Sequence, residues 1–179
     1  IYKGEEVDLC LCRTKAEFSQ EGNTRILTLD PVEIEFYDLT VSLQTRILFE
    51  EGSSCIRFER KILEMSDPAA EVEINEYMVA CYGTTEYSED MTGITLQCQN
   101  SKETRSISYE YKCREEELPG ASQVSAVIPQ IGTKASIECM DETATGYIRE
   151  GYAFSPMFTL GYTRKLKNKE VFETWLRLE

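Results

Sequence analysis

The sequence predicts an all-β protein: an antiparallel β-sandwich or barrel of about ten strands with disulfides and one short C-terminal helix. Three observations predict it. Apolar and polar residues alternate with a period of two, turn-forming residues separate these runs at short intervals, and most of the seven cysteines lie inside the runs. A chain of 179 residues can bury one core, so we expect a single domain over residues 1–179.

Residues 32–63 carry the clearest strand pattern. Val32, Ile34 and Phe36 alternate with polar residues, and the alternation resumes from Leu39 in the other phase, which indicates a bulge or a turn near Asp38. Residues 50–54 (EEGSS) are typical of a hairpin loop, so residues 55–63 are predicted as the returning strand.

Shorter runs on both sides predict the other strands. They cover residues 7–12, 25–29, 72–82, 94–98, 107–113, 124–128 and 135–139. The runs 94–98 and 107–113 flank a polar turn and are expected to form a hairpin. Residues 147–162 are aromatic and are divided by Gly151, Pro156 and Gly161.

Residues 168–178 predict the one helix. Asn168 is an acceptable N-cap, and Val171, Trp175 and Leu178 recur at helical spacing. We interpret Trp175 as the residue that docks this helix on a sheet, and a tryptophan that lines a ligand site is the alternative.

The cysteines predict disulfides and therefore a secreted protein, because extracellular β-domains use disulfides and paired CxxC motifs of a zinc site are absent. An odd number leaves one thiol free or available for a covalent dimer, and the oligomeric state stays open. The candidates are Cys10, Cys12, Cys55, Cys81, Cys98, Cys113 and Cys139.

The charge is strongly negative and unevenly distributed. A net charge of −13 argues against nucleic acid and against anionic membrane surfaces, and no apolar run is long enough to predict insertion into a membrane. Between Lys61 and Lys102 the chain has no lysine or arginine. We therefore expect an acidic surface that attracts a protein partner with a basic patch.

The chain has no histidine, which excludes the nucleophile–histidine pairs and most catalytic metal sites. Two glutamate pairs, Glu33/Glu35 and Glu71/Glu73, could act in glycoside cleavage, but the outward row of an amphipathic strand has the same pattern. The acidic loop 86–90 lacks the spacing of a calcium loop. We predict no enzyme, no cofactor and no metal site.

The first functional hypothesis is a secreted, disulfide-stabilised module that binds another protein, for example in an immune or cytokine pathway. Acidic side chains would steer a basic partner and tyrosines would anchor it. The predicted partner-binding residues are Glu71, Glu73, Glu76, Tyr82, Glu86, Tyr87, Glu89 and Asp90.

The alternative is a carrier of a small apolar ligand. The length, the all-β pattern, the disulfides and the C-terminal helix resemble lipocalin-like carriers, which have a Gly-x-Trp signature in their first strand; the only tryptophan here is Trp175. This resemblance implies a barrel with a ligand inside it. Candidate lining residues are Phe154, Met157, Phe158 and Leu160.

Overall fold

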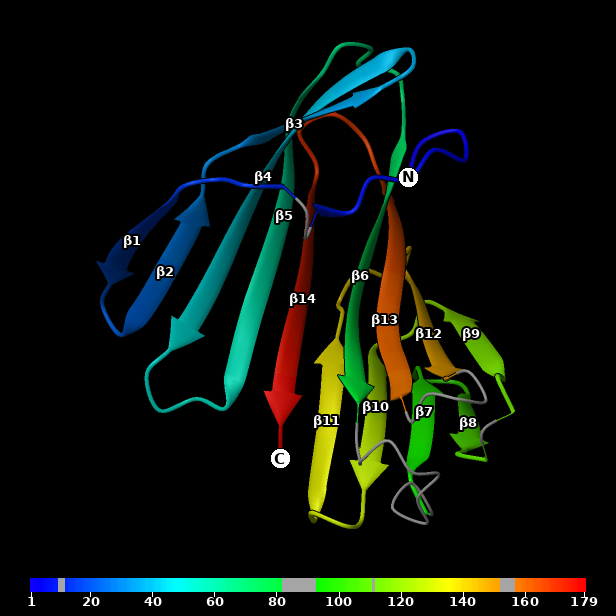
Figure 1. Cartoon of the computed structure of the whole chain (residues 1–179). Helices are drawn as coiled ribbons and strands as arrows, with labels where there is room; N and C mark the ends of the chain where they lie inside the picture. Colours follow the sequence, from blue (N-terminus) through cyan, green and yellow to red (C-terminus); the bar gives the residue numbers. More distant parts are fainter. Residues whose placement is uncertain (10–11, 82–92, 111, 152–156) are drawn as a thin grey trace. The chain divides into compact units, whose positions relative to one another are not determined.

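The computed structural model describes residues 1–9, 12–81, 93–110, 112–151 and 157–179, without the side chain of Cys81. Fourteen strands are formed within this part of the chain, they pair in antiparallel sheets, and the described residues contain no α-helix (Figure 1). They include no helix long and apolar enough to cross a membrane. The all-β antiparallel prediction is confirmed.

The chain folds into two compact units. The first consists of residues 1–74 and 164–175, and the second of residues 75–163 and 176–179. Three strands run from one unit into the other: β6 (Val72–Cys81), β13 (Met157–Leu166) and β14 (Val171–Leu178). The predicted single domain over residues 1–179 stays a prediction.

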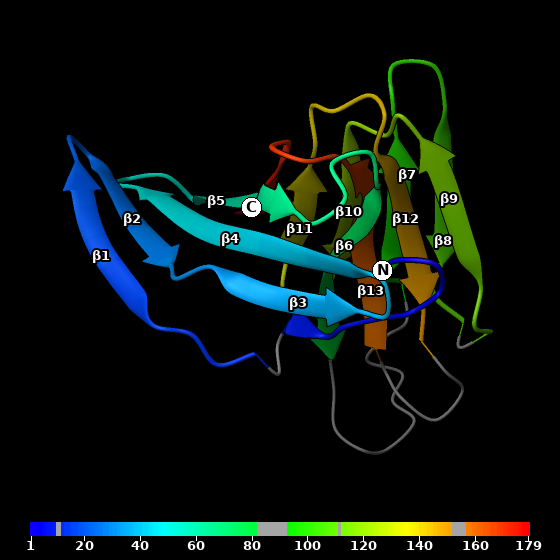
Figure 2. The same ribbon diagram turned by 90° about the horizontal axis from the view of Figure 1, so that it is seen from above.

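The first unit is built on a sheet in the order β1 (Ala16–Glu21), β2 (Thr24–Leu29), β4 (Leu39–Glu50) and β5 (Cys55–Met65), followed by the first part of β14. Strand β3 (Val32–Phe36) also pairs with β4. Figure 2 shows β1, β2 and β4 side by side, with β1 at the edge. A turn joins β3 to β4, which explains the change of phase around Asp38.

The second unit contains two sets of paired strands. One has the order β11 (Thr133–Glu138), β10 (Gln123–Ile128), β7 (Thr95–Gln99) and β8 (Thr104–Ser108). The other has the order β6, β13, β12 (Thr145–Glu150) and β9 (Glu115–Pro119). A hairpin forms at the predicted place from β7 and β8, but its second strand covers Thr104–Ser108 instead of residues 107–113.

Each unit buries apolar side chains from alternating strand positions, as the period of two predicts. Leu39, Val41 and Leu43 are buried in the first unit. In the second unit, Phe158, Leu160 and Tyr162 of β13 are completely buried.

Three structural predictions are wrong. Residues 168–178 form no helix, because β14 extends over Val171–Leu178 with Phe172 and Thr174 buried on one face. The described residues of 7–12 form no strand. The predicted disulfides are not found either, since no disulfide joins any two of Cys12, Cys55, Cys98, Cys113 and Cys139.

Candidate functional site

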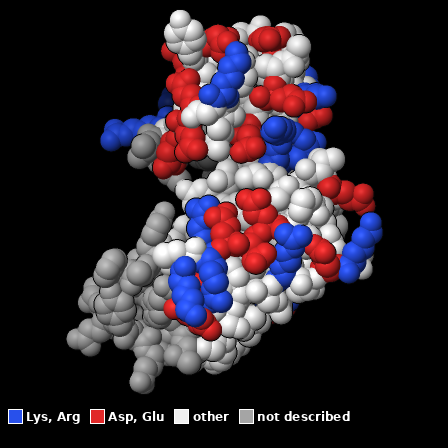
Figure 3. All heavy atoms as spheres, turned by 90° about the vertical axis from the view of Figure 1, so that its right-hand side faces the viewer, with Lys and Arg blue, Asp and Glu red and all other residues white. Residues whose placement is uncertain are grey.

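The predicted partner-binding residues do not form one visible surface. Tyr82, Glu86, Tyr87, Glu89 and Asp90 lie outside the described residues. The others lie on or beside β6. In Figure 3 the visible face carries Asp and Glu interspersed with Lys and Arg, rather than a purely acidic patch. The remaining predicted residues are Glu71, Glu73 and Glu76.

Two of these three glutamates make contacts within the protein, which give them a structural role. The Glu71 carboxylate lies 3.4 Å from the Lys167 ammonium group. The backbone of Glu73 pairs with Ile1, whose terminal amine donates to the Glu73 carbonyl at 2.7 Å. The backbone pairing of Glu73 therefore fixes the N-terminal residue, and the Glu71 ion pair connects residue 71 to Lys167.

A different group of residues lies together on the sheet of the first unit. Its centre is Arg57 on β5, whose guanidinium carbon is 5.7 Å from the centre of the Trp175 ring on β14. Arg57 Nη2 lies 2.8 Å from Glu59 Oε1 and 2.6 Å from Glu173 Oε1. The three charged residues and the tryptophan alternate by two along their strands, so one face of the sheet carries all of them.

A second arginine completes this group. Arg46 on β4 is the register partner of Glu59, and its Nη1 donates to Glu59 Oε2 at 2.9 Å. Glu59 thus binds one arginine with each carboxylate oxygen, which holds the carboxylate in one orientation. We call Arg46, Arg57, Glu59, Glu173 and Trp175 the Arg57 cluster.

The cluster is reached by solvent to different degrees. The side chain of Glu59 is only 11% exposed, whereas Arg57 and Glu173 are 37% and 34% exposed. Arg57 Nε is buried and has no hydrogen-bond partner among the described residues. An ordered buried carboxylate, a partly exposed carboxylate and an indole ring therefore lie around one guanidinium group.

Such a group of side chains can recognise a polyhydroxylated molecule. Carboxylates accept hydrogen bonds from hydroxyl groups, the guanidinium group donates to them, and the indole ring offers apolar surface. Because the two carboxylates flank one nitrogen, they could also take up and return protons at neighbouring oxygen atoms of a ligand.

The second unit contains another buried carboxylate, Glu150, at the end of β12. Its side chain is 0% exposed, and Arg114 Nε donates to its Oε2 at 3.0 Å. The backbone amide of Glu110 donates to Oε1. Burial alone raises the pKa of Glu150, but the bonds from Arg114 and from the amides of Glu110 and Lys112 lower it overall. We interpret this pair as a structural anchor of residues 108–110 and of Arg114.

No metal site is formed by the part of the chain that the structure describes: no group of three or more cysteine, aspartate or glutamate side chains is placed to hold an ion. The lining proposed for an apolar ligand is not formed as expected. Phe158 and Leu160 have no exposed surface, and Phe154 lies outside the described residues.

Of the Arg57 cluster, only Trp175 is predicted from the sequence, with a ligand site as the alternative role, and the predicted helix around it is wrong. The missed signal is the alternation of Glu173 and Trp175, which fits a strand, together with Arg57 and Glu59 on β5. Arg57 and Glu173 are 116 residues apart, so their contact follows only from the fold.

Comparison with known proteins shows the fold. No family model matches the chain, and no curated protein matches it. Several solved structures do. A galactose mutarotase related enzyme from Lactobacillus acidophilus has a TM-score of 0.61 and 9% identity, covering 94% of this chain and 71% of its own.

Two further structures agree. A candidate aldose 1-epimerase from Escherichia coli K12 has a TM-score of 0.60 and 13% identity, covering 94% of this chain and 69% of its own. A galactose mutarotase-like protein from Lactobacillus casei has a TM-score of 0.56 and 7% identity, covering 92% and 72%. The chain therefore has a galactose mutarotase-like fold.

This fold overturns three predictions from the sequence. The module for immune or cytokine-pathway binding is wrong, and so is the lipocalin-like carrier, because the strands form the sheets of galactose mutarotase-like proteins. The prediction that the chain is not an enzyme is also wrong. It relied on the absence of histidine and of known catalytic motifs, whereas a structure with the same fold is described as an enzyme. The extracellular location stays a prediction.

Proposed function

We propose that the chain binds a monosaccharide in its ring form at the Arg57 cluster. The observation that carries this proposal is the position of Arg57, which lies over Trp175 and contacts both Glu59 and Glu173 through one nitrogen. A pyranose offers hydroxyl groups to the charged side chains and C–H groups to the indole. The similarity to proteins described as galactose mutarotase-like supports this class of ligand.

We further propose that the bound sugar undergoes 1-epimerisation, the interconversion of its two anomers. The reaction removes a proton from the hydroxyl group at C1 while the ring oxygen gains one, the ring opens, and closure on the other face reverses both transfers. With no histidine in the chain, the carboxyl groups of Glu59 and Glu173 are the acid–base pair that this proposal assigns.

Ligand binding is tested by saturation-transfer NMR with D-galactose and D-glucose. We expect a transfer signal that is lost in Arg57→Ala and retained in Arg25→Ala, which removes an exposed arginine from the other face of the same sheet. Galactitol, the acyclic alditol of galactose, has no ring and should give no signal. Equal signals from galactose and galactitol would contradict ring recognition.

Catalysis is tested separately by polarimetry on freshly dissolved α-D-galactose. We expect the wild-type protein to accelerate the approach to equilibrium, and Glu59→Gln and Glu173→Gln to reduce this acceleration by about 10²-fold or more. An unchanged rate in both variants would refute the assigned acid–base pair, while the binding proposal would stand on the NMR result.

A further inference from the structure

Strand β1 is the outer strand of the first unit's sheet and has a free edge within the described part of the chain. All six residues of Ala16–Glu21 are exposed, and among the described residues β1 pairs with one strand, β2. An unprotected edge of this kind presents unpaired backbone N–H and C=O groups that can bind another strand.

The ladder between β1 and β2 determines which residues offer these groups. The Asp30 amide donates to the Lys15 carbonyl at 2.9 Å, and the register pairs Ala16 with Leu29. In an antiparallel pair the bonded positions alternate, so the odd-numbered residues from Lys15 to Glu21 point their backbone groups toward β2. The even-numbered residues Ala16, Phe18 and Gln20 therefore point theirs toward the free edge.

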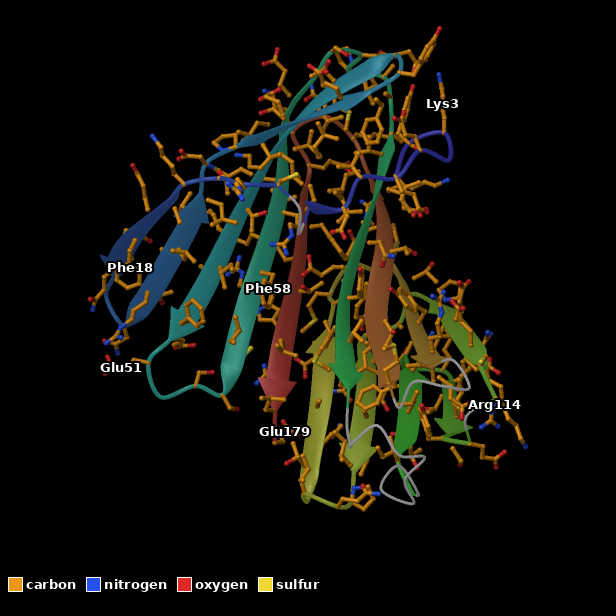
Figure 4. All side chains as sticks on the ribbon, in the orientation of Figure 1. Lys3, Phe18, Glu51, Phe58, Arg114 and Glu179 are labelled. Atoms are coloured by element: carbon orange, nitrogen blue, oxygen red, sulfur yellow. The ribbon has the colours of Figure 1, made fainter. Side chains whose placement is uncertain are left out.

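The same even-numbered residues place Phe18 at the end of an apolar row. Successive register pairs connect Phe18 to Leu27, Leu27 to Ile47, and Ile47 to Phe58, across four strands. Figure 4 labels the two ends of this row, Phe18 on β1 and Phe58 on β5. Phe18 is 64% exposed, whereas the three inner residues are half-buried, so the row is incomplete at its outer end.

We propose that this edge binds a second copy of the chain, with the two β1 strands antiparallel and Phe18 opposite Phe18 of the second copy. A two-fold axis perpendicular to the sheet relates the copies, so both Phe18 rings lie on the same face. The backbone groups that point outward are then all paired. The amide and carbonyl groups of Phe18 bond to those of Phe18 in the second copy, and those of Ala16 bond to those of Gln20 in the second copy. The apolar row becomes continuous through the joined sheets.

Charge selects this register over its two neighbours. With Phe18 opposite itself, Lys15 lies opposite Glu21 of the second copy and Glu17 lies opposite Ser19. A shift of two residues in one direction puts Glu17 opposite Glu21, and a shift in the other direction puts Glu17 opposite Glu17. Like charges directly opposite each other destabilise a strand pair, whereas opposite charges stabilise it. The proposed register is the one of these three with charge complementarity.

The interface is small, since it consists of one strand pair and the aromatic contact. Interfaces below about 1,200 Å² belong to weak and transient complexes, so we expect a reversible dimer rather than a permanent one. The Phe18 contact lies on the face of the sheet opposite the Arg57 cluster, and strands β2 and β4 separate β1 from β5, which carries Arg57.

Sedimentation velocity over a wide concentration range, with a reducing agent present to prevent disulfide-linked dimers, tests the proposal. Lys15→Glu and Glu21→Lys each create two like-charge pairs across the axis, and each should weaken dimerisation by about tenfold or more. The double variant restores opposite charges in the swapped order, and it should recover the wild-type dimerisation constant.

Phe18→Pro provides a second test. Proline removes the amide that points toward the free edge, but no amide that bonds to β2, so the β1–β2 hairpin should remain folded. We expect this variant to be monomeric with an unchanged circular dichroism spectrum. A wild-type protein that stays monomeric at the highest concentration, or a dimer in which the two charge variants and their combination behave alike, would overturn the proposal.

Discussion

The guanidinium group of Arg57 lies over the ring of Trp175, with its carbon 5.7 Å from the ring centre. This pair connects β5 to β14 and brings two glutamates to the same nitrogen of Arg57. An arginine in such a position is planar and can stack and bond at the same time, which a lysine cannot reproduce. The pair therefore places a guanidinium group, an indole ring and two carboxylates next to one another on the sheet of the first unit.

Replacement of Arg57 should change the environment of the single tryptophan. In Arg57→Ala the two glutamates lose their shared cation and the indole loses its cover, so we expect a shifted fluorescence emission and a lower melting temperature. Arg57→Lys should recover only part of both effects. The control is Arg25→Ala, which should leave the emission unchanged; an equal shift there would mean that Trp175 reports on global loosening.

The buried carboxylate of Glu150 should make stability depend on pH. Its pKa is lowered in the folded state, so its contribution is complete above the ordinary glutamate pKa of about 4.3 and is lost as the pH falls through the lower folded value. Glu150→Gln should reduce the free energy of unfolding at neutral pH and flatten its decline as the pH falls below the ordinary glutamate pKa of about 4.3.

Urea titrations at several pH values measure this dependence. The matched control is Glu117→Gln, which changes an exposed glutamate on β9. If Glu150→Gln and the wild-type protein lose stability in parallel as the pH falls, Glu150 does not carry the proposed linkage.

Gly161 should tolerate no side chain. A Cβ atom there would lie 2.6 Å from the Tyr147 ring carbon Cζ, and Tyr147 is itself fixed because its hydroxyl donates to Asn75 Oδ1 at 2.8 Å. We expect Gly161→Ala to destabilise the fold by about 1–3 kcal/mol, as overpacking of a core does. Thr159→Ala, two residues earlier on β13, is the control for denaturant unfolding. A Gly161→Ala variant as stable as the wild-type protein would show that Tyr147 can move.

The thiols should differ strongly in reactivity. Burial raises the pKa of the Cys98 thiol to about 12, whereas the side chain of Cys113 is exposed. Alkylation of the reduced native protein at mildly alkaline pH, read by peptide mass spectrometry, should label Cys113 quickly and Cys98 only after unfolding. Equal labelling of both thiols in the native protein would contradict the packing around β7.

Strands in which apolar and polar residues alternate can be predicted from the sequence, and strands without this alternation cannot. Residues 32–63 put apolar side chains at every second position, and β3, β4 and β5 form where that pattern predicts them. Strand β1 was missed because all its residues are exposed, so no buried row marks it. Strand β9 lies at a sheet edge and has one buried residue, Leu118, so no alternating apolar row predicts it.

Strand β14 shows how two periods can coincide. Val171, Trp175 and Leu178 fit a helical face, while Phe172 and Thr174 fit a buried strand face, and short segments do not distinguish the two. Pairing with β5 decides for the strand: the Ile62 amide donates to the Glu170 carbonyl at 3.0 Å, just before β14 begins. The cluster could not be predicted because its members come from three strands, and only their pairing brings them together.

The most direct test of the proposed ligand uses the fluorescence of Trp175, the only tryptophan in the chain. Titration with D-galactose should produce a saturable change in emission, in the millimolar range because a ligand on a sheet face stays partly in water. Arg57→Ala should abolish the change and Arg25→Ala should preserve it. A signal that never saturates, or that is the same in Arg57→Ala, would contradict monosaccharide binding at the Arg57 cluster.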